Sequence, residues 1–188
     1  GLGDVYKRQV SVRVGRPGGS DKSSDRTMSI ICPSLSAAAE YALIDQPTFR
    51  LVKRLLPGPF TFVLPSARAL PRLLHNKRLT VGIRIPDHPI PVGLAKALGH
   101  PLLVTTARLR SGDLASASSD FPGDWRDVVD VVVESEPIVP ELSTVVDCTT
   151  TPPTTIRVGK GLPEPDWQSL PDPEPDAAPD RTSGRRRK

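Results

Sequence analysis

The chain has 188 residues, of which 22 are proline and 14 are glycine, and only 37% are hydrophobic. This composition fits one domain with poorly packed tails, and two cysteines are too few for a disulfide framework, which favours a reducing compartment. Two cysteines and three histidines without ligand-like spacing exclude a structural zinc site. No apolar run approaches the roughly 18 residues of a membrane span, and the opening residues do not have the pattern of a secretory signal. We therefore expect a soluble, cytoplasmic protein.

Composition and charge divide the chain into three zones. Residues 1–21 are poor in core side chains, and we interpret them as a non-native or disordered leader. Residues 163–188 are rich in proline and acidic residues and end in "SGRRRK", so we expect a disordered tail whose basic end is either a nucleic-acid or localisation tag or a solvated terminus. Residues 22–162 carry the periodic signal of a folded domain. Their mild basic excess is compatible with a phosphate-bearing ligand.

The body alternates strand-like and helix-like segments. Short apolar runs predict strands at 27–32, 60–64, 79–85, 101–106, 127–134, 143–147 and 154–158. Helices are expected through "AAAEYAL" after Ser34 or Ser36, through "PTFRLVKRLL" until "PGP", and through "PIPVGLAKAL" before Gly99. On the second helix Phe49, Val52 and Leu56 share a face, which predicts that they point into the core. The pattern favours an α/β or α+β sheet domain.

Familiar catalytic signatures are absent from the sequence. It contains no phosphate-binding G-x-x-x-x-G-K-[ST] loop, no G-x-G-x-x-G, no H-E-x-x-H and no G-x-S-x-G. Neither Cys32 nor Cys148 has a basic neighbour that would activate its thiol, so both are expected to be packing residues.

Cations and hydroxyls remain, and they gather at the ends of predicted strands. Arg84 interrupts the apolar strand "VGIRIP", where a buried guanidinium needs either an ion pair with Asp87 or an anionic ligand. Thr105 and Thr106 end another strand, where open α/β sheets bind ligands, although threonine is also an ordinary strand residue.

The last two predicted strands carry similar groups. Ser143 and Thr144 begin "STVVD", and Arg157 closes "TTIRVGKG". Hydroxyls donate hydrogen bonds, the arginine fork fits phosphate oxygens, and the glycines at 159 and 161 allow close backbone approach.

Four motifs in order, "LPGPFTFVLPSARALPRLL", "TVGIRIPDHPI", "LGHPLLVTTARLRSG" and "STVVD…TTIRVGKG", make residues 22–162 resemble the YrdC-like domain family. The segments "SIICPSLSAAAEYALID" and "FRLVKRLLPGPFTF" resemble its YciO-type branch. The resemblance implies an α/β fold with a twisted, mainly parallel open sheet and a concave, positively charged surface. Against that pattern, the family's amino-terminal "PTDT-x-YGL" segment is missing, so the chain resembles an N-terminally truncated copy.

The best-understood members of this family are L-threonylcarbamoyladenylate synthases. They condense L-threonine, bicarbonate and ATP with Mg²⁺ for the modification of transfer-RNA adenosine. The resemblance implies that Arg84 and Ser143 bind threonine and that Arg157 binds the nucleotide phosphates. Lys22 and Ser29 match the family's lysine and downstream serine, which also bind the nucleotide. The resemblance does not identify a catalytic side chain, and the ligand count predicts no structural metal.

One family motif is altered. The pattern "TSAN-x-SG" is replaced by "TTARLRSG", with Thr106 for serine and Arg108 for asparagine. Threonine keeps a hydroxyl at this nucleotide-binding position. Arginine only donates hydrogen bonds whereas asparagine also accepts them, so Arg108 is expected to bind the nucleotide through phosphate and not through the same contact.

The altered motif leaves two alternatives to a synthase. One is a YciO-type module that binds a nucleotide, double-stranded RNA or tRNA without synthesis. The other is an inactive fragment of a longer protein.

Overall fold

A computed structural model describes residues 29–70, 78–106 and 141–163, together with Leu114, Val131, Val133 and Val139. The described elements are β1 (Ser29–Ile31), α1 (Leu35–Ala38), α2 (Gln46–Leu55), β2 (Phe60–Pro65), β3 (Thr80–Arg84), α3 (Pro89–Leu98), β4 (Leu102–Val104), β5 (Thr144–Asp147) and β6 (Thr154–Arg157). They confirm six of the predicted strands and all three predicted helices. The strand expected at 127–134 lies outside the described residues, apart from two single positions.

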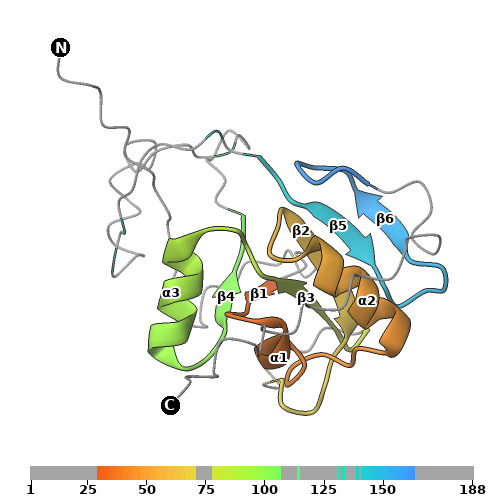
Figure 1. The fold of residues 1–188 in the computed structure, drawn as a ribbon, viewed down its shortest axis with the longest axis horizontal. Helices are drawn as coiled ribbons and strands as arrows, with labels where there is room; N and C mark the ends of the chain where they lie inside the picture. The colour runs from red at the N-terminus through yellow and green to blue at the C-terminus, as the bar shows by residue number, and fades with distance from the viewer. Residues whose placement is uncertain are drawn as a thin grey trace, which may run out of the picture.

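The six strands form one open sheet in the order β4-β1-β3-β2-β5-β6 (Figure 1). The α/β class and the open sheet are confirmed, but the sheet is mixed and not mainly parallel. Only β1 with β3 and β2 with β5 run parallel, whereas β1 with β4, β2 with β3, and β5 with β6 are antiparallel. A parallel pairing of consecutive strands needs a crossover of a dozen or more residues, and the link from β5 to β6 is too short for one.

The main core lies on one face of this sheet, under α1 and α2 (Figure 1). Strand alternation places Ile30, Phe62, Leu64, Ile83 and Val146 on this face, and all of them are buried. Helix α3 packs on the other face, where its Ala95 contacts Ile31 and Leu102. Within the described residues, α3 covers only the β4–β1 end of that face, because its strand contacts are with β1 and β4.

Helix α2 begins and ends as the sequence predicts, and Val52 and Leu56 of its predicted apolar face are buried. Asp45 caps its start by accepting a hydrogen bond of 2.9 Å from the Thr48 N–H, and the cap at Leu56 precedes Pro57. Its buried residues are Thr48, Leu51 and Val52, whereas Phe49 is 41% exposed, so the placement of Phe49 in the core was wrong.

Helix α1 is shorter than predicted for a tertiary reason. Ser34 caps it with a 3.2 Å bond from the Ala37 N–H, as one of the two predicted caps. The chain then leaves the helix because the Leu43 N–H bonds to the Pro65 carbonyl, next to the bridge between Ala42 and Ser66. This pairing with the end of β2 replaces a second helical turn.

None of the helices in the described part of the chain is long and apolar enough to cross a membrane.

Phe62 is the central packing residue of β2 and has no exposed surface. We expect Phe62→Ala to lower the free energy of unfolding by about 3–5 kcal/mol, because the truncation leaves a cavity in a close-packed core. Phe49→Ala, on the exposed side of α2, is expected to lower the free energy of unfolding by about 1 kcal/mol or less. Urea denaturation of both variants measures the difference, and equal losses would show that the core is not centred on β2.

Candidate anion-binding site

Strand alternation collects polar side chains on the sheet face opposite the main core. In β3, Val81 and Ile83 point into the core, so Gly82 and Arg84 point to the other side. The register places Gly82 beside Ser29 of β1. A Cβ atom built on Gly82 would lie 3.0 Å from the Ser29 Cβ and 3.3 Å from the Thr61 Cγ2, so the glycine leaves a notch between these two side chains. We call the group Ser29, Thr61, Gly82, Arg84, Ser143 and Arg157 the arginine face.

Ser143 and Arg157 are joined directly on this face. The Arg157 guanidinium donates to the Ser143 carbonyl from Nε at 3.2 Å and from Nη2 at 2.9 Å, and Nη2 also lies 3.3 Å from the Ser143 Oγ. The Ser143 Oγ lies 2.7 Å from the Thr61 Oγ1, and both residues are buried. A forked grip of this kind fixes the plane of the guanidinium.

The loop that follows β6 is held closely against the start of β5. The Thr144 hydroxyl donates to the Gly161 carbonyl and accepts a 2.9 Å bond from the Gly159 N–H. A Cβ on Gly159 would lie 2.2 Å from the Leu142 carbonyl oxygen, and one on Gly161 would lie 2.6 Å from the Phe60 ring. The glycines therefore permit the close approach expected from the sequence, and this contact anchors the strand end that carries Arg157.

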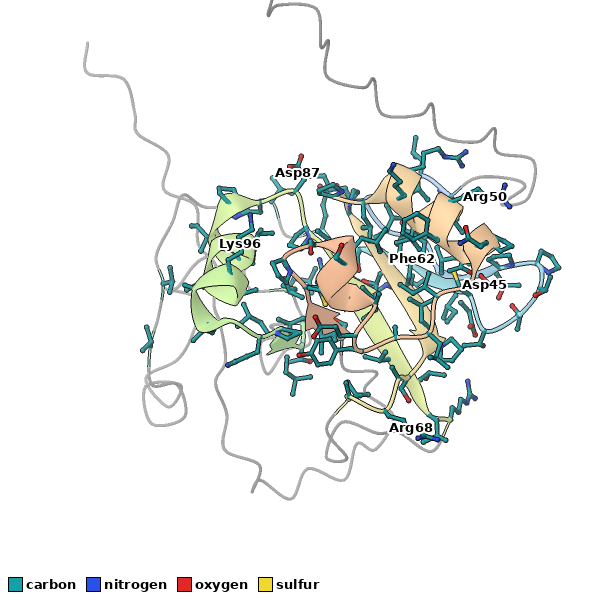
Figure 2. The ribbon with its side chains drawn as sticks, turned by 60° about the horizontal axis from the view of Figure 1, so that its bottom comes forward. Asp45, Arg50, Phe62, Arg68, Asp87 and Lys96 are labelled. Carbon is teal, nitrogen blue, oxygen red and sulfur yellow. The ribbon has the colours of Figure 1, made fainter. Side chains whose placement is uncertain are left out.

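Arg84 is a largely buried cation at the end of β3. Its Nε is buried without a hydrogen-bond partner. Burial lowers the pKa of Arg84, and the positive charge of Arg157 lowers it further. The ion pair with Asp87 considered above does not form among the described residues, and the Asp87 side chain points outward beyond β3 (Figure 2). A desolvated cation of this kind favours binding of an anion.

The structure brings together four of the seven predicted binding residues. Arg84, Ser143 and Arg157 lie on the arginine face, with Ser29 beside the Gly82 notch. Thr106 is exposed just after β4. Because β4 runs antiparallel to β1, the end of β4 lies beside Ser29, whereas Arg84 lies beside Ile31 at the other end of β1, so Thr106 and Arg84 are at opposite ends of the strands. Lys22 and Arg108 lie outside the described residues.

Thr61 is the member of this cluster that sequence reasoning missed. A threonine inside "FTFVL" looks like an ordinary strand residue, because β-branched side chains are common in strands. Only the pairing of β2 with β5 brings it to Ser143, which is 82 positions away.

The arginine face has the wrong donor set to hold Mg²⁺ itself. Magnesium prefers carboxylate and phosphate oxygens, whereas this cluster offers two guanidiniums and hydroxyls. Among the described residues no three His, Cys, Asp or Glu side chains gather as metal ligands. The expectation that Mg²⁺ accompanies ATP stays a prediction.

The thiols of the two cysteines pack on the core side of the sheet, although the Cys32 N–H bonds to the Arg84 carbonyl at 2.9 Å. A separate open hollow of about 380 Å³ lies at the start of α2, and its walls are formed by Leu43, Ile44, Asp45, Thr48, Pro65 and Cys148. Burial raises the pKa of both thiols to about 12, with added repulsion from Glu40 at Cys32 and from Asp147 and Asp45 at Cys148. A neutral thiol is a poor nucleophile, in agreement with the expected packing role.

Comparison with known proteins finds relatives in both sequence and fold. The sequence profile of the Sua5/YciO/YrdC family, described as "Telomere recombination", matches residues 21–159. The uncharacterized protein YciO of Escherichia coli is 33% identical over 135 residues, which cover 71% of this chain and 66% of YciO. The YciO crystal structure gives a TM-score of 0.68 over 72% of this chain. An uncharacterized protein of Haemophilus influenzae is 34% identical over 84% of this chain and 83% of its own length.

More distant relatives have a known activity or ligand. The threonylcarbamoyl-AMP synthase of Pyrococcus abyssi is 31% identical over 64% of this chain and 35% of the synthase. The crystal structure of P. abyssi Sua5 complexed with L-threonine has a TM-score of 0.65 and 27% identity, covering 72% of this chain and 41% of Sua5. The chain thus spans just under two thirds of YciO and about a third of the synthase.

Gly159 provides a test of the anchored loop. We expect Gly159→Ala to lower the free energy of unfolding by about 2 kcal/mol or more, because the new methyl group meets backbone atoms that cannot move aside. Gly93 in α3 is the matched control, since nothing lies within 4 Å of its added Cβ. Gly93→Ala is expected to raise stability by about 0.5–1 kcal/mol. Urea denaturation of both variants is the measurement, and tolerance of Gly159→Ala would contradict the close packing.

The thiols give a prediction with a defined pH dependence. At pH 8 iodoacetamide should label Cys32 and Cys148 slowly in the folded chain and rapidly in urea, where their pKa values return to the ordinary range. Because folding raises both pKa values, the thiols stabilise the fold below about pH 9, and this contribution is lost as the pH rises toward 12. Mass spectrometry of the labelled peptides measures the rates. Rapid labelling of the folded chain would contradict this burial.

Proposed function

Because this chain belongs to the Sua5/YciO/YrdC family, we propose that the arginine face binds L-threonine and ATP and that the protein forms threonylcarbamoyl-AMP. The observation that carries the proposal is Arg84, a buried cation beside a second cation, without an ion pair among the described residues. Two cations on a face with three hydroxyls form a site for anions, and carboxylate and phosphate are the anions that arginine binds best.

Each residue of the arginine face has a role in this proposal. Arg84 holds the carboxylate of threonine, and Ser143, which is buried next to Thr61, contacts the same amino acid. Arg157, whose plane is fixed by the Ser143 carbonyl, faces the phosphates of ATP. Ser29 borders the Gly82 notch and, with Lys22, contacts the nucleotide.

The chemistry asks mainly for positioning. The amine of threonine takes up bicarbonate and loses water, which gives a carbamate. A carbamate oxygen then attacks the α-phosphorus of ATP, and the bond to the β-phosphate breaks with release of pyrophosphate. Bicarbonate, ATP and the carbamate are anions and threonine has a carboxylate, so fixed guanidiniums that offset their repulsion and hold them in line supply the catalysis. The product would serve the threonylcarbamoyl modification of tRNA adenosine.

A second candidate is a module that binds a nucleotide or RNA without synthesis. It is favoured by the larger match to YciO, which covers 66% of that protein against 35% of the synthase, and by the arginine at 108 in the altered motif. Such a module would bind double-stranded RNA or tRNA with an affinity that falls steeply with salt. The same partial coverage is the basis of a third candidate, an inactive fragment of a longer protein.

Pyrophosphate release separates these candidates. With the 188-residue chain, release of pyrophosphate from Mg-ATP is expected only when L-threonine and bicarbonate are both present. Arg84→Gln is expected to lower kcat/KM for threonine at least about 30-fold, because the carboxylate loses a charge-assisted partner. Arg84→Lys should keep part of the activity, since it keeps the charge without the fork.

Arg68→Gln is the matched control, because Arg68 is exposed on the turn after β2, at the far end of that strand from Thr61 (Figure 2). It should release pyrophosphate at the wild-type rate. Release that ignores threonine, or no release from the wild-type chain, would contradict the synthase. Salt-sensitive RNA binding in a chain without release would favour the second candidate.

A further inference from the structure

The hydroxyls of Thr61 and Ser143 form a buried pair within the arginine face. Their oxygens lie 2.7 Å apart, and each residue is 6% exposed. Thr61 comes from the interior of the sheet, where β2 is paired on both sides by β3 and β5. A hydroxyl in this position has a fixed backbone and little freedom to turn toward solvent.

Counting donors limits how the pair can be arranged. Arginine only donates, so the Arg157 Nη2 at 3.3 Å occupies one lone pair of the Ser143 Oγ. One hydrogen lies between the two hydroxyl oxygens. If Thr61 provides it, the Ser143 Oγ accepts twice and its own hydrogen remains available for an incoming anionic oxygen. If Ser143 provides it, Ser143 has no donor left for an anion.

Electrostatics favour the first arrangement. The charges of Arg84 and Arg157 act on the same face, and a hydroxyl next to a cation turns its oxygen toward that cation and its hydrogen away. The Ser143 oxygen faces Arg157 in both arrangements. Only with Thr61 as donor does the serine hydrogen remain available to an anion bound by the two arginines.

We propose that Thr61 is a positioning residue of this site: its hydroxyl donates to Ser143, which orients the serine hydroxyl as an anion donor and holds Arg157 in place. The assignment rests on the proposed function for the identity of the anion, the carboxylate of L-threonine. The part that concerns Arg157 does not depend on that function.

Three substitutions at one position separate the hydroxyl from the shape. Thr61→Val keeps the branched shape and loses the hydroxyl, whereas Thr61→Ser keeps the hydroxyl and loses the methyl group. Thr61→Ala, compared with Thr61→Ser, differs only in the hydroxyl and carries the test if the valine variant melts without cooperativity. Thr48→Val is the control, because Thr48 is also a buried threonine but lies in α2 on the opposite side of the sheet.

Calorimetry with L-threonine is the first readout. Thr61→Val is expected to weaken binding about tenfold, the loss of one well-made hydrogen bond to a charged ligand. Thr61→Ser should stay within about threefold of wild type, and Thr48→Val should bind as wild type. In the reaction assay the larger loss should fall on KM for threonine, with a smaller rise in KM for ATP because Arg157 is held less firmly. Equal affinity of Thr61→Val and wild type, or equal loss in Thr61→Ser and Thr61→Val, would overturn the proposal.

The second readout needs no ligand. The Arg157 Nε–H bonds to the Ser143 carbonyl, so its NMR signal, assigned by its absence in Arg157→Lys, should exchange slowly with water. Exchange should become roughly fivefold faster in Thr61→Val, as loss of about 1 kcal/mol of restraint implies, and should stay unchanged in Thr48→Val. Unchanged exchange in Thr61→Val would overturn the positioning role. Absence of threonine binding in the wild type would instead refute the proposed function, while this exchange still decides the role of Thr61.

Discussion

The constraint on which the rest of this structure depends is that two positively charged side chains, Arg84 and Arg157, lie near each other on one face of the sheet. Burial lowers the pKa of Arg84, and the charge of Arg157 lowers it further, so holding the Arg84 guanidinium charged at this position is unfavourable without an anion. Two groups of hydrogen bonds hold Arg157 in place despite this repulsion. Its guanidinium donates twice to the Ser143 carbonyl, and the loop after β6 is bonded to Thr144. Two cations that repel each other are stabilised by a bound anion, and the proposed function is placed on this face for that reason.

Strand alternation separates this charged face from the core. The same five residues of β3 place Val81 and Ile83 against α1 and α2, and Arg84 on the opposite face. The hollow beside α2 lies on the core side and holds a carboxylate that is already used as a helix cap. The arginine face and this hollow therefore lie on opposite sides of the sheet.

Much of the fold could be predicted from local sequence. Apolar runs and turn residues located the strands, and Pro47 and Gly99 marked the start of α2 and the end of α3. The direction of strand pairing could not be predicted this way, because strands with parallel and antiparallel neighbours have similar sequences. The sheet is mixed, whereas a mainly parallel sheet was expected. Arg84 was recognisable because it breaks an apolar strand. Thr61 was not, because its role exists only through a partner 82 residues away.

Titration of the chain with Mg-ATP by calorimetry, with and without L-threonine and bicarbonate, tests the central claim most directly. The account predicts that ATP binds and that threonine tightens the binding, because the proposed site holds the two reactants side by side on Arg84 and Arg157. ATP binding that threonine leaves unchanged, or no ATP binding in a chain that unfolds cooperatively, would contradict it.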